Sequence, residues 1–530
     1  MKKKQILALL LALCMLAGLL AGCGSSEEPS GGGGGESQPA GGGDENPGGN
    51  DDPGETVEIV VGCLAFSPVD ENVQTRIENA VNEKMKEMIN VTADFMWFDA
   101  LNYSTQIPMM LQANEQLDAI MYTPIPSASF TSFENQGQLM DISQYVDQYG
   151  PDIKKELGEA GLAGTTRGGK LLGVSAVMAN SQMEAIVMRT DVLEEIGRLD
   201  DFNNMKTWSD FEDILKDVVA AGYPGLANSD GEGTIFNTMP YLAGAENFAD
   251  CVWIDQGGDG NQQIYIDPAD DTVKCIYESE SFKQMMIRAG QFYDEGLIFK
   301  DAATSIDYAA TQVKNGVGTV YINAIDFGGE GQHIAGAGYP LTFKYIDGTQ
   351  AQLSTGAFTK FGWAVPVTAR EPEAAVKFIN LLYSENAVHN TLAYGEEGVD
   401  WVRNADGTAA YPNGGDSAEY HMSDFMYGDI LTICPWEGED PDLRTQQRTS
   451  NAELAPSKYV GFAIDTTPVS SEVTACANIK TTYKPMLASG AYGSNTEATW
   501  EKFINELHGA GMDKILAEYQ RQLDAWLAEQ

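Results

Sequence analysis

The fold is decided by the stretch EIVVGCL at residues 58–64 and by the segments that follow it. This run is rich in β-branched residues and predicts a strand. Apolar residues then recur near helical spacing over 71–88, and a second helix is expected over 103–113. Residues 91–98 and 117–122 have the character of further strands. The resulting strand–helix–strand–helix–strand order predicts an α/β fold in which helices cover a parallel sheet.

Ligands of such a sheet bind at the loops beyond the carboxyl ends of its strands. In this chain those loops begin near Phe66, near Trp97 and Phe98, and near Tyr122. We therefore expect part of a binding site at these three positions.

The N-terminus has the pattern of a signal peptide. Lys2, Lys3 and Lys4 precede an apolar run over 6–20, which small residues and Cys23 follow. This run is shorter than the roughly 20 residues that a spanning helix needs. A cysteine directly after small residues resembles the bacterial lipobox, which implies that residues 1–22 are removed and that Cys23 carries lipid. An uncleaved anchor or an ordinary secretory signal is the alternative, and in each case the chain leaves the cytoplasm.

A linker joins this segment to the folded part of the chain. Residues 23–55 are Gly, Ser, Pro and acidic residues with almost no apolar side chains. Such a segment cannot bury enough surface to offset its chain entropy, so we expect it to be disordered and to act as a tether. About 470 residues remain, which is enough for two large lobes.

Composition excludes several classes of function. The formal net charge is −45, so a nucleic acid partner is not expected. The four histidines lie far apart, and there is no H-E-x-x-H, C-x-x-C or phosphate-binding glycine motif. The loop from Asp255 to Asn261 has only part of a calcium-loop pattern and is interpreted as a solvated turn. No catalytic residue, metal or cofactor is therefore predicted.

The cysteines that remain beside Cys23 after processing do not form a disulfide framework. Their number is odd and their spacing wide. They can be buried free thiols, or Cys251 and Cys275 can close one loop; the sequence leaves both possibilities open. The five are Cys63, Cys251, Cys275, Cys434 and Cys476.

A series of landmarks along the chain points to a family. The segments are LDAIMY at 117–122, GKLLGV at 169–174, KTWSDF at 206–211, GVGTVY at 316–321, WAVP at 363–366 and EPEAAVKFINLL at 371–382. In this order they resemble the extracellular solute-binding proteins of the carbohydrate-uptake ABC transporter class. Thr207 or Ser209 is expected to cap one helix, and Pro372 to stand in the first turn of another.

The C-terminal part resembles one branch of that class. The segments YGEEGVDW at 394–401, WEGEDPDL at 436–443, GFAID at 461–465 and QLDAW at 522–526 are similar to clostridial and bacillar members. Those members carry an extra C-terminal region and are usually assigned to oligosaccharide uptake.

The resemblance implies a two-lobe periplasmic-binding-protein-like fold with interlobe hinge strands and a ligand cleft. On the positions of the landmarks, residues 56–172 and 368–429 would form lobe one. Residues 173–367 and 430–530 would form lobe two. The expected protein is a monomeric, lipid-anchored receptor without enzymatic activity. It would capture a carbohydrate outside the cell and deliver it to the permease subunits of an ABC importer.

Candidate site residues follow from the chemistry of sugars. Aromatic rings cover the apolar faces of a sugar, and acidic or amide groups pair with its hydroxyls. The net charge favours a neutral or cationic sugar unless an arginine such as Arg167 or Arg189 compensates. The candidates are Phe66, Trp97, Tyr122, Trp363, Trp401 and Trp436 for the faces, with Asn323 and Asp326 for the hydroxyls.

Two other functions remain open from the sequence. A surface sugar sensor or adhesion module could use the same fold. A secreted polysaccharide hydrolase would need two carboxylates flanking the scissile bond, and sequence spacing cannot reveal such a pair.

Overall fold

A computed structural model describes most of the chain after residue 54. The described residues are 55–65, 69–227, 246–248, 264–305, 307–346, 353–384, 387–415 and 417–530. The predictions for the signal peptide, the linker, Cys23, Phe66, Cys251 and the loop from Asp255 to Asn261 lie outside these residues. Within the described ranges, no helix has both the length and the apolar character needed to cross a membrane.

The first sheet contains the three predicted strands. Its strand order is β2-β1-β3-β12-β6, and β1 pairs in parallel with both β2 and β3, as predicted. The last two strands differ, because β12 is antiparallel to β3 and to β6. The bounds are β1 (Val57–Leu64), β2 (Val91–Phe98), β3 (Ala119–Tyr122), β6 (Val174–Ser175) and β12 (Gly362–Ala364).

Helices cover this sheet because each has one apolar stripe. On α2, Val73, Ile77, Val81 and Met85 are buried at four-residue intervals. Pro372 is the first residue of α15, as predicted. The helices and hairpin strands of this part are α2 (Glu71–Ile89), α3 (Ala100–Gln112), α4 (Phe130–Asn135), α5 (Ser143–Tyr149), α6 (Pro151–Gly164), β4 (Thr166–Arg167), β5 (Lys170–Leu171), α15 (Pro372–Leu381), α16 (Ala387–Tyr394), β13 (Val402–Arg403) and β14 (Ala409–Ala410).

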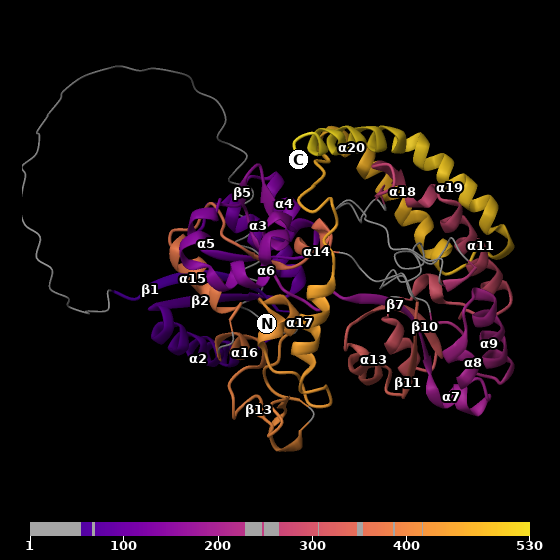
Figure 1. The fold of residues 1–530 in the computed structure, drawn as a ribbon, viewed down its shortest axis with the longest axis horizontal. Helices are drawn as coiled ribbons and strands as arrows, with labels where there is room; N and C mark the ends of the chain where they lie inside the picture. The colour runs from indigo at the N-terminus through magenta and orange to yellow at the C-terminus, as the bar shows by residue number, and fades with distance from the viewer. Residues whose placement is uncertain are drawn as a thin grey trace, which may run out of the picture. The chain divides into compact units, whose positions relative to one another are not determined.

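A second sheet has the antiparallel order β10-β7-β11 (Figure 1). Side chains of β7 alternate between two hydrophobic clusters, so both faces of the sheet are covered. Thr207 caps α9 together with Asp210, which confirms one of the two predicted caps. The elements are β7 (Gln182–Arg189), α7 (Thr190–Glu195), α8 (Leu199–Asn204), α9 (Trp208–Ala220), β8 (Ile264–Asp267), β9 (Thr272–Cys275), α11 (Glu280–Asp294), α12 (Ala309–Lys314), β10 (Val320–Asp326), α13 (Glu330–Ala337) and β11 (Leu341–Tyr345). The short helix α14 (Thr355–Phe358) follows them in the chain and contacts α6 of the first part.

The C-terminal part is helical. It consists of α17 (Leu443–Glu453), α18 (Ser470–Ala488), α19 (Thr496–Ala510) and α20 (Met512–Leu527). The last three helices lie side by side in Figure 1 and contact one another. The side chains of Phe503 on α19 and Tyr519 on α20 are buried in the hydrophobic cluster that also contains residues of the second sheet. This part therefore shares a core with the second sheet.

The buried residues form two large hydrophobic clusters, and each cluster is built from two separate stretches of the chain. The first takes residues from 59–177 and 361–434, and the second from 186–346 and 459–523. The predicted lobe boundaries need a correction, because they put 173–177, 361–367 and 430–434 into lobe two. Val174 and Trp363 pack in the first cluster, since β6 and β12 extend the first sheet beyond β3.

The described cysteines Cys63, Cys275, Cys434 and Cys476 are free and buried. Burial raises the pKa of the Cys63 thiol well above its ordinary value, so this thiol stays protonated. In the described part of the chain, no group of three or more His, Cys, Asp or Glu residues could hold a metal ion.

Candidate functional site

Three of the predicted sugar-facing aromatics are core residues. The side chains of Tyr122 and Trp363 are fully buried, and Trp401 is 2% exposed. The Tyr122 hydroxyl donates to the Phe358 carbonyl, the Trp363 Nε1 to that of Tyr427, and the Trp401 Nε1 to that of Gly395. The predictions that these rings cover a sugar are therefore wrong for this structure, because neighbouring segments cover them.

Trp97 packs against the first cluster, whereas Asn323 and Asp326 belong to the second sheet. Trp97 is half-buried, and its ring packs edge-on against Tyr420 and Tyr427 in the first cluster. Asn323 and Asp326 lie within β10. Gln182 donates a hydrogen bond to Asp326, and burial raises the pKa of this carboxyl above its ordinary value. None of these three residues lines the cavities of about 780 and 600 Å³ described below.

Trp436 is the predicted residue that lines a large cavity. The volume of this cavity, which we call the aromatic cavity, is about 780 Å³. Part of the lining comes from residues between Tyr394 and Glu439, and part comes from helix α13. The lining is Gly331, Gln332, Ile334, Ala335, Tyr394, Tyr411, His421, Met422, Ser423, Phe425, Trp436, Glu437, Gly438 and Glu439.

Four rings meet at this cavity. The centroid of the Trp436 ring lies 5.0 Å from that of Tyr394, 4.9 Å from that of Tyr411 and 4.6 Å from that of His421. The Tyr411 hydroxyl and the His421 Nδ1 share a hydrogen bond of 3.0 Å. Rings at these separations and tilted angles support one another, so Trp436 is held as part of a rigid aromatic wall.

Backbone hydrogen bonds fix the segment that carries Trp436. Glu437 N–H donates to the carbonyl of Ala409, which belongs to β14. Trp436 N–H donates to the Glu439 carboxylate at 2.7 Å. Gly438 between the two glutamates has a φ of 95°, a conformation that favours glycine. The turn therefore presents Glu437 and Glu439 beside the tryptophan.

A second part of the lining comes from α13. Its Ile334 is 39% exposed and adds an apolar side chain to the lining. Gln332 on the same helix adds an amide group. Apolar cover on two sides with a few polar groups is the lining expected for a small-molecule site.

The site residues predicted from the sequence do not include Tyr394, Tyr411 or His421. Tyr394 lies in the quoted segment at 394–401, but nothing in that pattern shows where its ring points. The rings converge because β14 pairs with β13 and forms a bridge with Trp436. Such pairings between distant segments have no local signal.

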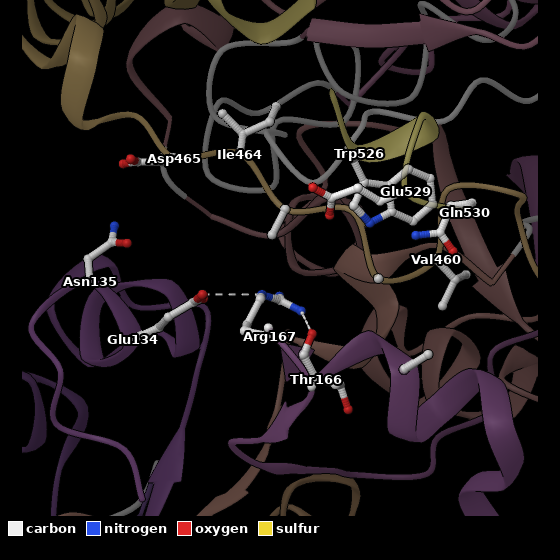
Figure 2. A pocket seen from close by; sticks show the side chains of 15 residues that line it. Glu134, Asn135, Thr166, Arg167, Val460, Ile464, Asp465, Trp526, Glu529 and Gln530 are labelled. Carbon is white, nitrogen blue, oxygen red and sulfur yellow. Dashed lines mark hydrogen bonds and ion pairs between the residues drawn. The ribbon is translucent and has the colours of Figure 1, made fainter. Parts of the chain in front are cut away.

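A second cavity, of about 600 Å³, lies elsewhere (Figure 2). Glu134, Arg167, Asp465, Trp526 and Glu529 are among its lining residues. The Nε of Arg167 lies 3.3 Å from the Oε1 of Glu134, as the dashed line in Figure 2 shows. The Arg167 guanidinium in this cavity is thus already paired with Glu134, and Trp526 is the one aromatic residue in the described lining. We therefore favour the aromatic cavity as the functional site.

Two family models match the chain. The model described as bacterial extracellular solute-binding protein matches residues 72–388. A model described as a domain of unknown function (DUF3502) matches residues 458–528, the region of α18, α19 and α20.

Relatives match over nearly the whole chain. A carbohydrate ABC transporter substrate-binding protein of Streptococcus pneumoniae serotype 4 is 21% identical over 471 residues, covering 86% of this chain and 89% of the relative. The N-glycan transport solute binding protein (NgtS) from Streptococcus pneumoniae has a TM-score of 0.73 at 18% identity, covering 89% of this chain and 99% of that one.

Other solved structures share the fold. The complex of that protein with Man5GlcNAc has a TM-score of 0.65 at 19% identity, covering 89% and 99% of the two chains. The alginate-binding protein AlgQ2 has a TM-score of 0.60 at 17% identity, covering 89% and 98%. The predicted two-lobe α/β fold of solute-binding proteins is confirmed by these likenesses, and by its family match the chain belongs to the bacterial extracellular solute-binding proteins.

Proposed function

We propose that this protein captures an oligosaccharide outside the cell in the aromatic cavity and delivers it to the permease of an ABC importer. The observation that carries the proposal is the group of partly exposed rings Tyr411, His421 and Trp436, which the buried ring of Tyr394 supports from behind, in a cavity that residues of α13 also line. Aromatic faces suit the apolar C–H faces of sugars, and relatives over nearly the whole chain are named for glycan or alginate binding. Capture and release require no covalent step, so we propose no catalysis.

We further propose that the two large clusters act as lobes. α17 joins them: its Gln447 donates to the Phe327 carbonyl beside the second sheet, and its Asn451 donates to the Met178 carbonyl beside the first. Closure around a ligand moves one lobe against the other. In the predicted monomeric receptor, a segment that contacts both lobes can keep them connected during this movement.

Replacing Trp436 with alanine is expected to weaken glycan binding about tenfold to a hundredfold, or about 1–3 kcal/mol, because the apolar cover of a sugar ring is lost. A thermal-shift screen of mono- and oligosaccharides, including Man1GlcNAc and Man5GlcNAc, would first find a ligand. Calorimetry with that ligand then compares the variant with the unaltered protein.

Trp526→Ala is the matched control, since Trp526 lines the second cavity. It should leave the affinity unchanged. Loss of binding in Trp526→Ala with full binding in Trp436→Ala would move the site to the second cavity.

We also propose that Cys23 anchors the protein to the outer face of the membrane. Changing Cys23 to alanine is expected to release the protein into the medium or to leave it unprocessed, because the acylated thiol is lost. Cell fractionation measures this directly. Mass spectrometry that found an unmodified Cys23 in the mature, membrane-bound protein would contradict the proposal.

A further inference from the structure

The permanently charged side chains among the described residues that line the aromatic cavity are all negative. Among its described lining residues, the acidic side chains are Glu437 and Glu439, and there is no lysine or arginine. His421 is the remaining ionisable group apart from the two tyrosines, and it bonds to Tyr411 and packs on Trp436. No permanent cation of the lining is therefore available to a bound anion.

The arginines near this region are engaged with other groups. Arg403 Nη1 donates to the Cys434 Sγ at 2.7 Å, and its guanidinium lies 5.3 Å from the Trp401 ring centroid. Arg444 Nη1 donates to the Gln447 Oε1 at 3.0 Å. Neither arginine lines the cavity.

The two arginines that the sequence analysis offered as compensating charges also lie elsewhere. Arg167 lines the second cavity and pairs with Glu134. Arg189 pairs with Asp191 at 2.5 Å and stacks on Tyr339, with its Cζ 3.7 Å from the ring centroid. The condition under which an anionic sugar was expected is therefore not met at the aromatic cavity.

Glu437 and Glu439 are fixed beside the ring that would cover the sugar. Glu439 accepts the Trp436 N–H, and Glu437 is hydrogen-bonded through its own N–H to Ala409. A carboxylate or phosphate on the ligand would approach these glutamates with no cation between them. Like charges brought together in this way select against one class of ligand.

We infer that the aromatic cavity rejects glycans that carry uronate, sialate, sulfate or phosphate groups and accepts their uncharged counterparts. Glu437 and Glu439 are the specificity-determining residues. This inference rests on the proposed function, because it assigns a ligand class to the same cavity.

Calorimetry on the mature protein with matched glycan pairs tests the inference. The pairs are β-1,4-mannotriose with β-1,4-trimannuronate, lactose with 3′-sialyllactose, and Man5GlcNAc with its 6-phosphorylated form. For every pair of which one member binds, the neutral member should bind at least about tenfold more tightly at low salt. Added salt should narrow the difference, because it screens exposed charges.

Each other outcome has a distinct meaning. An anionic member that binds as tightly as its neutral partner would overturn the inference and leave the proposed function standing. No binding of any glycan would overturn the proposed function and the inference with it.

The double variant Glu437→Gln with Glu439→Gln keeps an acceptor for the Trp436 N–H and removes both charges. It should raise the ratio of anionic to neutral affinity at least about fivefold. Glu529→Gln, at the second cavity, is the matched control and should leave this ratio unchanged. An unchanged ratio in the double variant would remove the glutamates as the cause of selectivity.

Discussion

Replacing Trp363 with alanine is expected to lower the free energy of unfolding by about 3–5 kcal/mol, the usual cost of truncating a buried large aromatic ring. Trp363 is fully buried in β12, its ring centroid lies 5.5 Å from that of Phe378, and its Nε1 donates to the Tyr427 carbonyl. The variant would leave both a cavity and an unpaired carbonyl. Denaturant unfolding followed by circular dichroism measures the loss.

The result also decides between two roles for this residue. Trp436→Ala is the control, since Trp436 is only half-buried and should cost less stability. If Trp363→Ala unfolded like the unaltered protein but lost its glycan affinity, Trp363 would return to the binding site, where the sequence analysis had placed it.

Replacing Arg448 with alanine is expected to destabilise the protein by about 3 kcal/mol at neutral pH. Arg448 on α17 pairs with two shielded carboxylates: its Nη2 lies 3.2 Å from the Oδ2 of fully buried Asp429, and its Nη1 bonds to Glu156. Removing the guanidinium leaves the Asp429 charge buried without a cation. Asn451 and Gln447 tie the same helix to segments beside both sheets, so the loss should also loosen the connection between them.

The loss should depend on pH. Burial raises the pKa of Asp429 to about 6, and Arg448 opposes that rise. A carboxyl with a raised folded pKa contributes stability that is fully present below its unfolded pKa, near 4, and is lost as the pH rises through about 6. Without Arg448 the folded pKa rises further, so the variant should lose more stability at pH 7.5 than at pH 5.

Denaturant unfolding of both proteins at the two pH values tests this. Arg521→Ala, which removes an exposed ion pair with Glu518, is the control and should change stability little at either pH. An equal loss in Arg448→Ala at both pH values would show that Asp429 is not the group responsible.

The part of the fold that local pattern controls could be predicted. The runs at 58–64 and 91–98 form β1 and β2 because β-branched and alternating residues fit a half-buried sheet, and the stripe at 71–88 forms α2. Thr207 and Pro372 act at helix starts as their chemistry requires. These features depend on neighbours within a few residues.

The aromatic site could not be predicted in the same way. Tyr122 ends a strand, but β3 lies between β1 and β12, and the Phe358 carbonyl, 236 residues away in sequence, accepts the hydrogen bond of its hydroxyl. The sequence around Trp436 gives no stronger signal for a binding residue than the sequence around Tyr122. The backbone of Trp436 nevertheless pairs with Ala409, and its ring lines a cavity together with α13. Whether a ring is buried or available depends on which distant segment covers it.

Local patterns in the amino-acid sequence are therefore enough to predict the α/β character, the family landmarks and the net negative charge of this chain. Contacts between distant segments set which rings meet, which arginines form ion pairs, and how far β6 and β12 extend the first sheet. The physical reason is the range of the interactions: propensity, capping and periodicity act within one element, whereas burial and ion pairing are set by contacts between elements far apart in the chain.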